Sequence, residues 1–144
     1  MTLYVLDSDH VTLHQRGDII VINRLAALPS QQTYTSIITV EEQLRGWLAV
    51  IRRAQQPKQL VSAYASLHRA IVYFSRINVL DYSEKAAERF VALRAEKIRI
   101  GTKDLRIAAI ALAVGGIVVT RNQRDFRQVP DVITEDWSES FSAH

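Results

Sequence analysis

The chain of 144 residues contains no cysteine. This absence excludes disulfide bonds, thiolate nucleophiles and zinc sites built on cysteine. It is also compatible with a reducing compartment, and we expect the protein to act in the cytoplasm. A metal ion bound by this chain must therefore be held by oxygen or histidine ligands.

Long hydrophobic runs and domain-breaking segments are absent as well. No window reaches the roughly 18 consecutive apolar residues of a membrane span. The first residues show neither the basic segment nor the cleavage site of a signal peptide. Only three prolines and five glycines interrupt the chain, and none of them marks a boundary. We therefore predict one domain over residues 1–144, long enough to bury a core, with no membrane association.

Acidic residues are missing from a long central stretch, although the net charge is only +3. No Asp or Glu stands between Glu42 and Asp81, and this stretch holds the basic residues Arg45, Arg52, Arg53, Lys58, Arg69 and Arg76. A second basic group, near the C-terminal end, comprises Arg121, Arg124 and Arg127. Basic clusters beside an acidic site suit a polyanionic substrate. The alternative is that each arginine belongs to a solvated helix surface.

The most informative segment is residues 5–10, VLDSDH, where an apolar strand ends in two carboxylates. Ligands collect in the crevice beyond the carboxyl ends of parallel strands, which makes Asp7 the first candidate for a metal ligand. Asp9 follows two residues later as a second acid. The alternative is that Asp7 only ends the strand or caps the helix after it.

The pattern along the chain predicts alternating strands and helices. Strands are expected at residues 2–6, 33–37, 78–80, 117–119 and 132–133. Helices are expected at residues 9–15, 18–27, 40–54, from Pro57 over about five turns, from Ser83, and at 103–114, with Ser83 and Thr102 as N-caps. This order predicts an α/β fold, a three-layer α/β/α sandwich with a parallel central sheet. The stripe of Leu44, Leu48 and Ile51 is interpreted as a core face. Trp47 and the stripe Tyr64–Phe74 are interpreted as core or as a dimer surface, with base-stacking platforms as the alternative.

Four acids fall at comparable places in this scheme. Asp7 follows the first strand, Glu42 lies in the first turn of the helix after the second, Asp104 begins helix 103–114, and Asp125 follows the strand at 117–119. A parallel sheet brings these places to one edge. Oxygen ligands without cysteine or a histidine pair favour Mg²⁺ or Mn²⁺ over zinc. Clustered carboxylates also repel each other, and a divalent cation relieves that repulsion.

Each acid also has a structural alternative. Glu42 or its neighbour Glu41 can be a residue that favours the helix dipole, and helical periodicity does not select between them. Asp104 can be a first-turn acid, although it begins an otherwise apolar helix, where an unpaired charge is costly. Asp125 can be an exposed loop acid paired with Arg121 or Arg124.

Four motifs, in order from about residue 3 to residue 137, resemble PIN-domain proteins of the VapC type, the ribonuclease toxins of bacterial toxin–antitoxin pairs. They are LDSDH with Asp7, TSIITVEEQLRG, GTKDLRIAAIAL with Asp104, and VVTRNQRDF followed by EDW. In the second motif of the family a Thr precedes the acid by three residues and a Gly follows it by four. Thr39, Glu42 and Gly46 satisfy this spacing, so the resemblance selects Glu42 over Glu41.

The resemblance implies a metal-dependent endoribonuclease in which Asp7, Glu42 and Asp104 hold Mg²⁺ or Mn²⁺ and the region of Asp125 supplies a fourth polar group. It also implies a homodimer and inhibition by a VapB-type antitoxin. On this reading the candidate RNA contacts are Arg45, Arg121 and Arg124.

The chain departs from the family at two positions. Members often have Asn at the position of Asp9 and some have an acid at the position of Asn122, which leaves Asn122 and Asp125 as alternatives for the fourth group. Asp9, Asn122, Ser8 and Thr120 are candidates for contacts just behind the metal ligands, with turn or cap roles as the alternative for the two hydroxyls. His10 is nearest the site but has no partner that suggests a proton relay.

Two other functions compete with the nuclease. The segment Asp7-Ser8-Asp9-His10-Val11 fits the first motif of haloacid-dehalogenase-like phosphatases, with Asp7 as nucleophile and Asp9 as general acid, but the late strand is followed by Thr120-Arg121-Asn122 instead of paired acids. The other alternative is a catalytically silent RNA-binding PIN-like module. Retention of all four acids argues against it.

Overall fold

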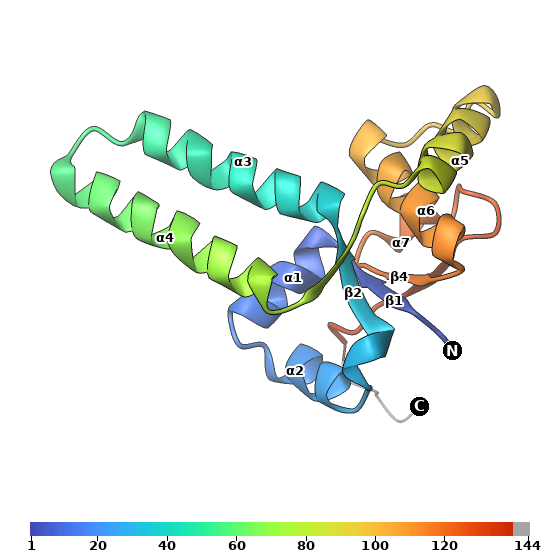
Figure 1. Ribbon diagram of the computed structural model, residues 1–144, viewed down its shortest axis with the longest axis horizontal. Helices are drawn as coiled ribbons and strands as arrows, with labels where there is room; N and C mark the ends of the chain where they lie inside the picture. Colours follow the sequence, from blue (N-terminus) through green and yellow to red (C-terminus); the bar gives the residue numbers. More distant parts are fainter. Residues whose placement is uncertain (140–144) are drawn as a thin grey trace.

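The computed structural model describes residues 1–139, so residues 140–144 of the predicted domain lie outside the described part. The strands are β1 (Tyr4–Leu6), β2 (Thr33–Ser36), β3 (Asn78–Leu80), β4 (Ile117–Val119) and β5 (Ile133–Glu135). The helices are α1 (Ser8–Gln15), α2 (Ile19–Ala26), α3 (Ile37–Arg53), α4 (Pro57–Ser75), α5 (Glu84–Ala95), α6 (Thr102–Val114) and α7 (Gln123–Phe126), and a 3-10 turn, Ser30–Gln32, precedes β2 (Figure 1).

Within the described residues the strands form one five-stranded sheet in the order β3-β2-β1-β4-β5. Every pair is parallel, and in the centre Val5 lies between Tyr34 and Val118. The chain moves outward from β1 through β2 to β3 and returns on the other side through β4 and β5. The order therefore reverses between β1 and β4, and ligands of open parallel sheets bind beyond the carboxyl ends of strands at such a point.

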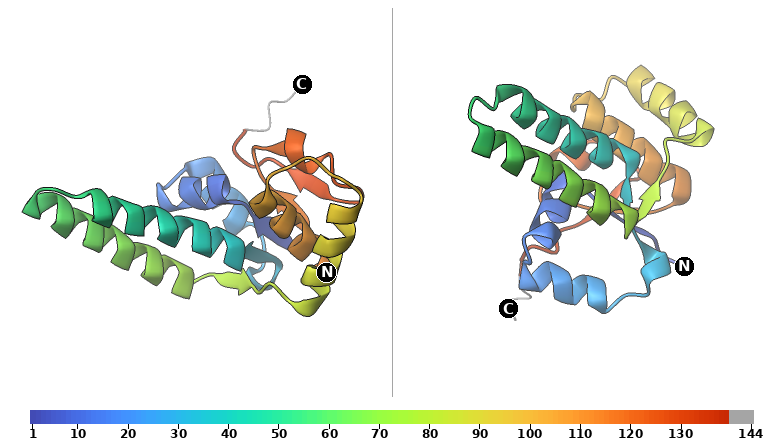
Figure 2. Two further views of the ribbon diagram at one scale, coloured as in Figure 1. Left: turned by 90° about the horizontal axis from the view of Figure 1, so that it is seen from above. Right: turned by 60° about the vertical axis from the view of Figure 1, so that its left-hand side comes forward.

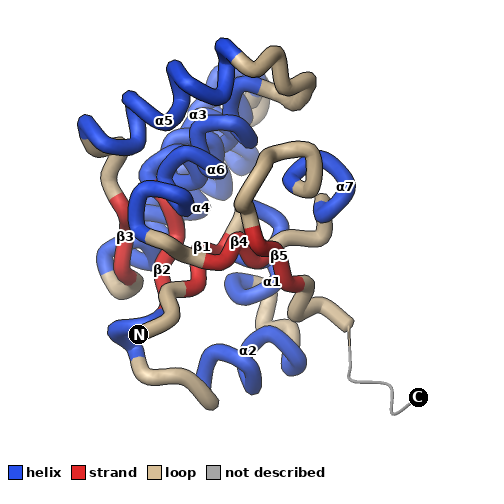
Figure 3. The backbone as a smooth tube through the Cα atoms, turned by 90° about the vertical axis from the view of Figure 1, so that its right-hand side faces the viewer, coloured by secondary structure: helices blue, strands red, loops and turns tan. Residues whose placement is uncertain are grey.

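Helices cover both faces of the sheet, which confirms the predicted three-layer α/β/α fold. On one face Val5 and Val118 pack with α6 and with Leu93 of α5. On the other face Leu6 and Val119 pack with Val11 of α1 and with residues of α2. Figure 3 shows α2 on one side of the sheet and α5 and α6 on the other. The alternation of neighbouring residues between the two faces follows from the period of two along a strand.

Helix α6 is the most buried helix, as its apolar sequence predicts. Its buried residues are Leu105, Ile107, Ala108, Ala109, Ile110 and Ala111. The helix ends at Gly115, whose φ of 66° lies in the left-handed region that favours glycine. Gly116 then approaches β1 so closely that an added Cβ would lie 3.2 Å from the carbonyl oxygen of Leu3. Asp104 stands in the first turn of this helix. Because α6 packs against the sheet, it fixes the position of the Asp104 carboxylate relative to the sheet.

Helices α3 and α4 form a long hairpin that extends away from the sheet (Figures 1 and 2). Several residues of the predicted apolar stripes are therefore exposed: Leu48 by 49%, Tyr64 by 54% and Ile71 by 52%. The core interpretation of these positions was wrong, because much of the hairpin has no sheet beneath it. Their role in a dimer surface stays a prediction.

Two predicted boundaries were also wrong. Ile37 was assigned to a strand, but α3 begins at Ile37, with the Ser36 hydroxyl accepting a hydrogen bond from the Thr39 amide at 3.2 Å. Thr102 was predicted as an N-cap, but it is the first residue of α6 and Gly101 is the cap, without a side-chain hydrogen bond. Ser83 does cap α5 as predicted. No helix in residues 1–139 is both long and apolar enough to cross a membrane.

Candidate active site

Asp7 lies at the centre of the carboxyl edge, directly after β1. It is 7% exposed and caps α1, because its carboxylate accepts a hydrogen bond from the Ser8 amide at 2.7 Å. The other carboxylate oxygen accepts a hydrogen bond from the Thr120 hydroxyl, at the end of β4, at 2.9 Å. The helix cap considered as an alternative for Asp7 is thus present, but it leaves the carboxylate at the wall of a cavity.

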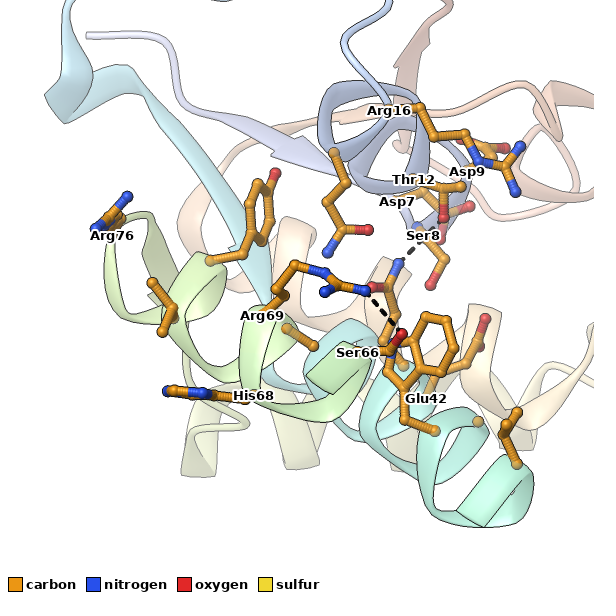
Figure 4. A pocket seen from close by; sticks show the side chains of 18 of the residues that line it. Asp7, Ser8, Asp9, Thr12, Arg16, Glu42, Ser66, His68, Arg69 and Arg76 are labelled. Carbon is orange, nitrogen blue, oxygen red and sulfur yellow. Dashed lines mark hydrogen bonds between the residues drawn. The ribbon is translucent and has the colours of Figure 1, made fainter. Parts of the chain in front are cut away.

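This cavity has a volume of about 1210 Å³ and is lined by Asp7, Asp9, Glu42, Asp104 and Asn122, among others (Figure 4). Asp125 stands behind this wall. The Asn122 side-chain amide donates to Asp125 at 3.0 Å and to Asp104 at 3.3 Å. The structure therefore brings three of the four predicted acids to the cavity and connects the fourth to it through Asn122.

Glu41 and Glu42 are adjacent in sequence but have different surroundings. Glu42 lines the cavity, and its carboxylate lies 2.6 Å from the Lys103 ammonium group. Glu41 is exposed and pairs with Arg45 at 2.7 Å, one helical turn further along α3. Sequence reasoning did not single out Lys103, which stands next to Asp104 and places a positive charge at the edge of the acid cluster.

The acids perturb each other as a cluster of like charges should. The pKa of Asp7 is raised from its ordinary value of 3.8 to about 6, first by burial and then by the charge of Asp9, with hydrogen bonds from Ser8 and Thr120 acting the other way. Burial, followed by the charges of Asp125 and Glu42, also raises the pKa of Asp104. Both carboxylates are therefore poorly compensated without a cation.

The raised pKa of Asp7 predicts a dependence of stability on pH in the metal-free protein. Between about pH 4 and pH 6 the folded chain binds more protons at Asp7 than the unfolded chain, so stability falls as pH rises through this window. The shift corresponds to about 3 kcal/mol at most. We expect Asp7→Asn to be more stable than the wild type at pH 7.5 in EDTA, and to lose this advantage below about pH 4.

Denaturant unfolding of both proteins at several pH values measures the difference. Parallel pH profiles for wild type and Asp7→Asn would contradict the account of this carboxylate. Exposed Asp81→Asn is the matched control and should follow the wild type.

Asp9, whose role the sequence left open, belongs to a buried network with His10. The His10 ring is fully buried, and its Nδ1 lies 2.7 Å from one oxygen of Asp9. Its Nε2 accepts a hydrogen bond from the Trp137 amide at 3.0 Å, which assigns the ring proton to Nδ1. The other oxygen of Asp9 accepts from the Arg121 amide at 3.0 Å. His10 and Asp9 thus tie α1 to the segments after β4 and β5.

We expect His10→Ala to lower the free energy of unfolding by about 3 kcal/mol, because it opens a cavity and leaves the Trp137 amide without its acceptor. Denaturant unfolding measures this loss. His10→Gln should recover part of the stability, because its side-chain oxygen can accept from the same amide. Full stability of His10→Ala would show that the network does not hold the C-terminal segment.

The two hydroxyl candidates differ in their surroundings. Thr120 is buried, and its hydroxyl is already hydrogen-bonded: it donates to Asp7 and accepts from the Asn122 amide at 2.9 Å. The Ser8 hydroxyl oxygen is buried and, within residues 1–139, has no hydrogen-bond partner, although the residue lines the cavity. A buried polar atom without a partner at the wall of a cavity suits a bound ligand or an ordered water.

The donor set fits a hard divalent cation in its chemistry, since it offers carboxylate and amide oxygens. Its geometry is not a closed cage: within the described residues no group of three or more acidic or histidine side chains already converges on one point. Glu42 is instead held by Lys103. A metal ion would therefore have to draw Glu42 inward while Asp7 and Asp104 remain on their rigid elements.

The predicted RNA contacts do not line this cavity. Arg45 is exposed and paired with Glu41, and Arg121 and Arg124 are exposed and are not among the lining residues. The arginines at the wall are Arg16, Arg69 and Arg76. Periodicity along α4 could have found two of these, because Arg69 and Arg76 are seven residues apart and share a face.

The parallel sheet and the acidic cavity at its carboxyl edge define a class, the α/β domains whose functional site lies beyond the carboxyl ends of parallel strands. The sequence matches the family model of the PIN domain over residues 4–132, and the chain belongs to this family.

Within this family, the chain is similar to several proteins of the VapC type. The tRNA(fMet)-specific endonuclease VapC of Shigella flexneri is 44% identical over 70 residues, which cover 46% of this chain and 53% of that relative, about half its length. Ribonuclease VapC1 of Haemophilus influenzae is 26% identical over 142 residues, 94% of this chain and 98% of the relative. A chain in the crystal structure of DNA-bound VapBC from Salmonella typhimurium superposes with a TM-score of 0.76 at 27% identity, covering 95% of this chain and 99% of that one. These findings confirm the resemblance to VapC-type proteins.

Proposed function

We propose that this protein is a metal-dependent endoribonuclease, the toxin of a type II toxin–antitoxin pair, acting on RNA in the cytoplasm. The observation that carries this proposal is the set of carboxylates that meet at one cavity, with the pKa values of Asp7 and Asp104 raised. The names of the relatives, ribonuclease VapC1 and tRNA(fMet)-specific endonuclease VapC, support the reaction.

Asp7, Glu42 and Asp104 would hold Mg²⁺ or Mn²⁺, and Asn122 or Asp125 would supply the fourth polar group. A divalent ion in such a site activates water for attack on a phosphodiester and stabilises the charge that develops on the phosphate oxygens. Asn122 is the better candidate for the fourth position, because it lines the cavity and Asp125 lies behind it at 3.0 Å.

The neighbouring side chains keep the ligands in place. Thr120 holds one oxygen of Asp7 and the Ser8 amide holds the other, so this carboxylate cannot rotate away. Asn122 orients Asp104, whereas Glu42 is paired with Lys103 and would have to leave this pair to bind an ion. The free Ser8 hydroxyl is placed to contact a phosphate oxygen or a water molecule.

The proposal includes partners. The solved complexes from Salmonella typhimurium and Haemophilus influenzae are VapBC assemblies, so we expect a VapB-type antitoxin to bind this chain. We also expect a homodimer, as the resemblance to VapC-type proteins implies. The exposed apolar residues of the α3–α4 hairpin offer a surface for one of these contacts.

Adjacent glutamates provide a test of the proposal. We expect Glu42→Gln to lower the rate of RNA cleavage by roughly 100-fold, equivalent to about 2.7 kcal/mol of transition-state stabilisation. Glu41→Gln, its matched control on the outer side of α3, should stay within about twofold of the wild type. Purified protein, cellular RNA and mapping of the cleaved ends give the readout. Equal losses in both variants would reject Glu42 as a ligand, and absence of discrete internal cleavage by the wild type would reject the nuclease.

A further inference from the structure

A second part of the cavity wall carries the opposite charge, on α4 and at the end of α1. Arg16, at the end of α1, and Arg69 and Arg76, of α4 and its C-terminal end, line the same cavity as Asp7 and Glu42 (Figure 4). In Figure 4 the Arg69 side chain projects between α4 and the elements that carry the acids. The cavity is thus acidic where the ligands meet and basic along α4.

These arginines are not used by the fold. All are exposed, and within residues 1–139 none of them lies in a salt bridge; the recorded contact of Arg69 is a hydrogen bond to the Ser66 hydroxyl at 3.0 Å. Helix α4 also contains no acidic residue that could neutralise them. Apart from the one donor that Arg69 gives to Ser66, these guanidinium groups have donors left for a ligand, and guanidinium groups match phosphate oxygens in geometry.

The spacing along α4 suits an extended ligand. Arg69 and Arg76 are seven residues apart, which places them on one side of the helix, about 10 Å from each other along its axis. Ser66, Tyr73 and these two arginines follow the i, i+3, i+7, i+10 pattern of one helical face, and all line the cavity. A single phosphate needs only one of these groups, whereas a nucleic acid backbone can meet both.

Electrostatics explains why such a wall is needed. An RNA strand that enters a cavity lined by Asp7, Asp9, Glu42 and Asp104 is repelled by their carboxylates. Cationic side chains beside the acids offset this repulsion and supply most of the sequence-independent affinity of a nucleic acid complex. The arginines paired or placed outside the cavity, Arg45, Arg121 and Arg124, cannot do this at the reacting phosphate.

We propose that Arg16, Arg69 and Arg76 bind the backbone phosphates of single-stranded RNA next to the bond that is cleaved, and thereby guide that bond to the acid cluster. This inference rests on the proposed function and adds its substrate-positioning residues. The residues do not touch the reacting atoms; they hold the strand on either side of them. A protein segment of the antitoxin is the competing occupant, and the net positive wall favours the polyanion.

Binding measurements test the inference in the Asp7→Asn background, where RNA stays intact. Arg69→Gln and Arg76→Gln are compared with the control variants Lys58→Gln and Arg89→Gln, at exposed residues that do not line the cavity, using a fluorescent single-stranded RNA at several salt concentrations in Mg²⁺. We expect each cavity variant to weaken binding by about 3- to 10-fold and to reduce the slope of log affinity against log salt by about 0.7, the contribution of one phosphate contact to a single strand. The controls should keep the wild-type affinity and slope.

Steady-state kinetics distinguishes a failure of the arginine proposal from a failure of the nuclease proposal. With active protein, the cavity variants should raise KM several-fold and change kcat by less than about twofold, as expected for removal of ground-state binding. If the wild type cleaves the RNA but the cavity variants bind and react like the controls, the arginine wall is wrong and the nuclease stands. The wall is also wrong if the cavity variants lose only antitoxin binding. If the wild type neither binds nor cleaves RNA, both proposals fail.

Discussion

Replacing Asp7 by Asn should reduce RNA cleavage by at least about 1,000-fold, equivalent to roughly 4 kcal/mol of transition-state stabilisation. Asp7 is the most buried acid of the cavity and lies between hydrogen bonds from Ser8 and Thr120, so its carboxylate has one fixed direction. The amide keeps the shape of the side chain and removes its charge. We therefore expect the loss in activity without a loss of fold, and relief of any growth inhibition caused by the wild type.

The expected stability of Asp7→Asn distinguishes a loss of activity from a loss of fold. Near neutral pH and without metal, Asp7→Asn should be at least as stable as the wild type, because the raised pKa of Asp7 marks a carboxylate that the fold does not favour in its charged form. Loss of activity therefore cannot be attributed to unfolding. Exposed Asp81→Asn is the control and should cleave normally. Undiminished cleavage by Asp7→Asn, in protein checked for contaminating nuclease, would contradict the assignment of Asp7.

Removal of divalent metal should reduce RNA cleavage about as strongly as the substitution Asp7→Asn. We expect EDTA to reduce cleavage by roughly 1,000-fold or more and Mg²⁺ or Mn²⁺ to restore it, because a divalent ion held by the acid cluster would both activate water and offset the charge on the phosphate oxygens. Metal should also stabilise the wild type, by about 2.7 kcal/mol at a concentration 100 times the dissociation constant. Thermal unfolding with and without Mn²⁺ measures this second effect.

Asp7→Asn again provides the matched comparison. Its unfolding temperature should respond little to Mn²⁺, since one of the ligands has lost its charge. Cleavage that continues at the same rate after exhaustive chelation would remove the proposed mechanism, whatever the variant does.

The sequence predicts the position of the site well, for a topological reason. Parallel strands end at one edge, so residues that follow β1 and β4 meet without any knowledge of side-chain packing. Asp7 and Thr120 illustrate this: they are separated by more than a hundred residues in sequence and lie 2.9 Å apart. The same logic brings Asp104 and Glu42 to the cavity from the starts of α6 and α3.

The sequence predicts contacts across the site poorly. The burial of His10 depends on where the segment after β5 crosses α1, and no periodicity carries that information. The same is true of Lys103, which reaches Glu42 from a different helix. The arginines at the cavity were not predicted for a related reason: two of them, Arg69 and Arg76, come from α4 and its C-terminal end, and which cavity this helix lines depends on how it folds back along α3. The role of Arg45, Arg121 and Arg124 in RNA binding stays a prediction.

In the α3–α4 hairpin, hydrophobic periodicity again does not predict a structural feature. Amphipathic stripes on α3 and α4 predict an apolar face but cannot tell whether the molecule itself covers it. Tyr64 and Ile71 are half exposed because the hairpin extends beyond the sheet. We expect a partner or a second copy to cover this face in the proposed assembly.

The structure also bears on the rival functions. In a phosphatase of the haloacid-dehalogenase type Asp9 would have to act as a general acid, but both of its oxygens are engaged, by His10 and by the Arg121 amide. A silent binding module would keep several repelling carboxylates in one cavity with no benefit. The nuclease is the function for which the same acids are needed.

Direct titration of Mn²⁺ tests the central proposal most closely, because it requires no knowledge of the RNA. Calorimetry on the metal-free protein should show saturable binding to the wild type, accompanied by proton release near pH 6, where Asp7 titrates. Binding should be lost or at least about tenfold weaker in Asp7→Asn and in Asp104→Asn, and unchanged in Asp81→Asn. Equal Mn²⁺ binding by all four proteins, or none by the wild type, would contradict a metal site at this cavity.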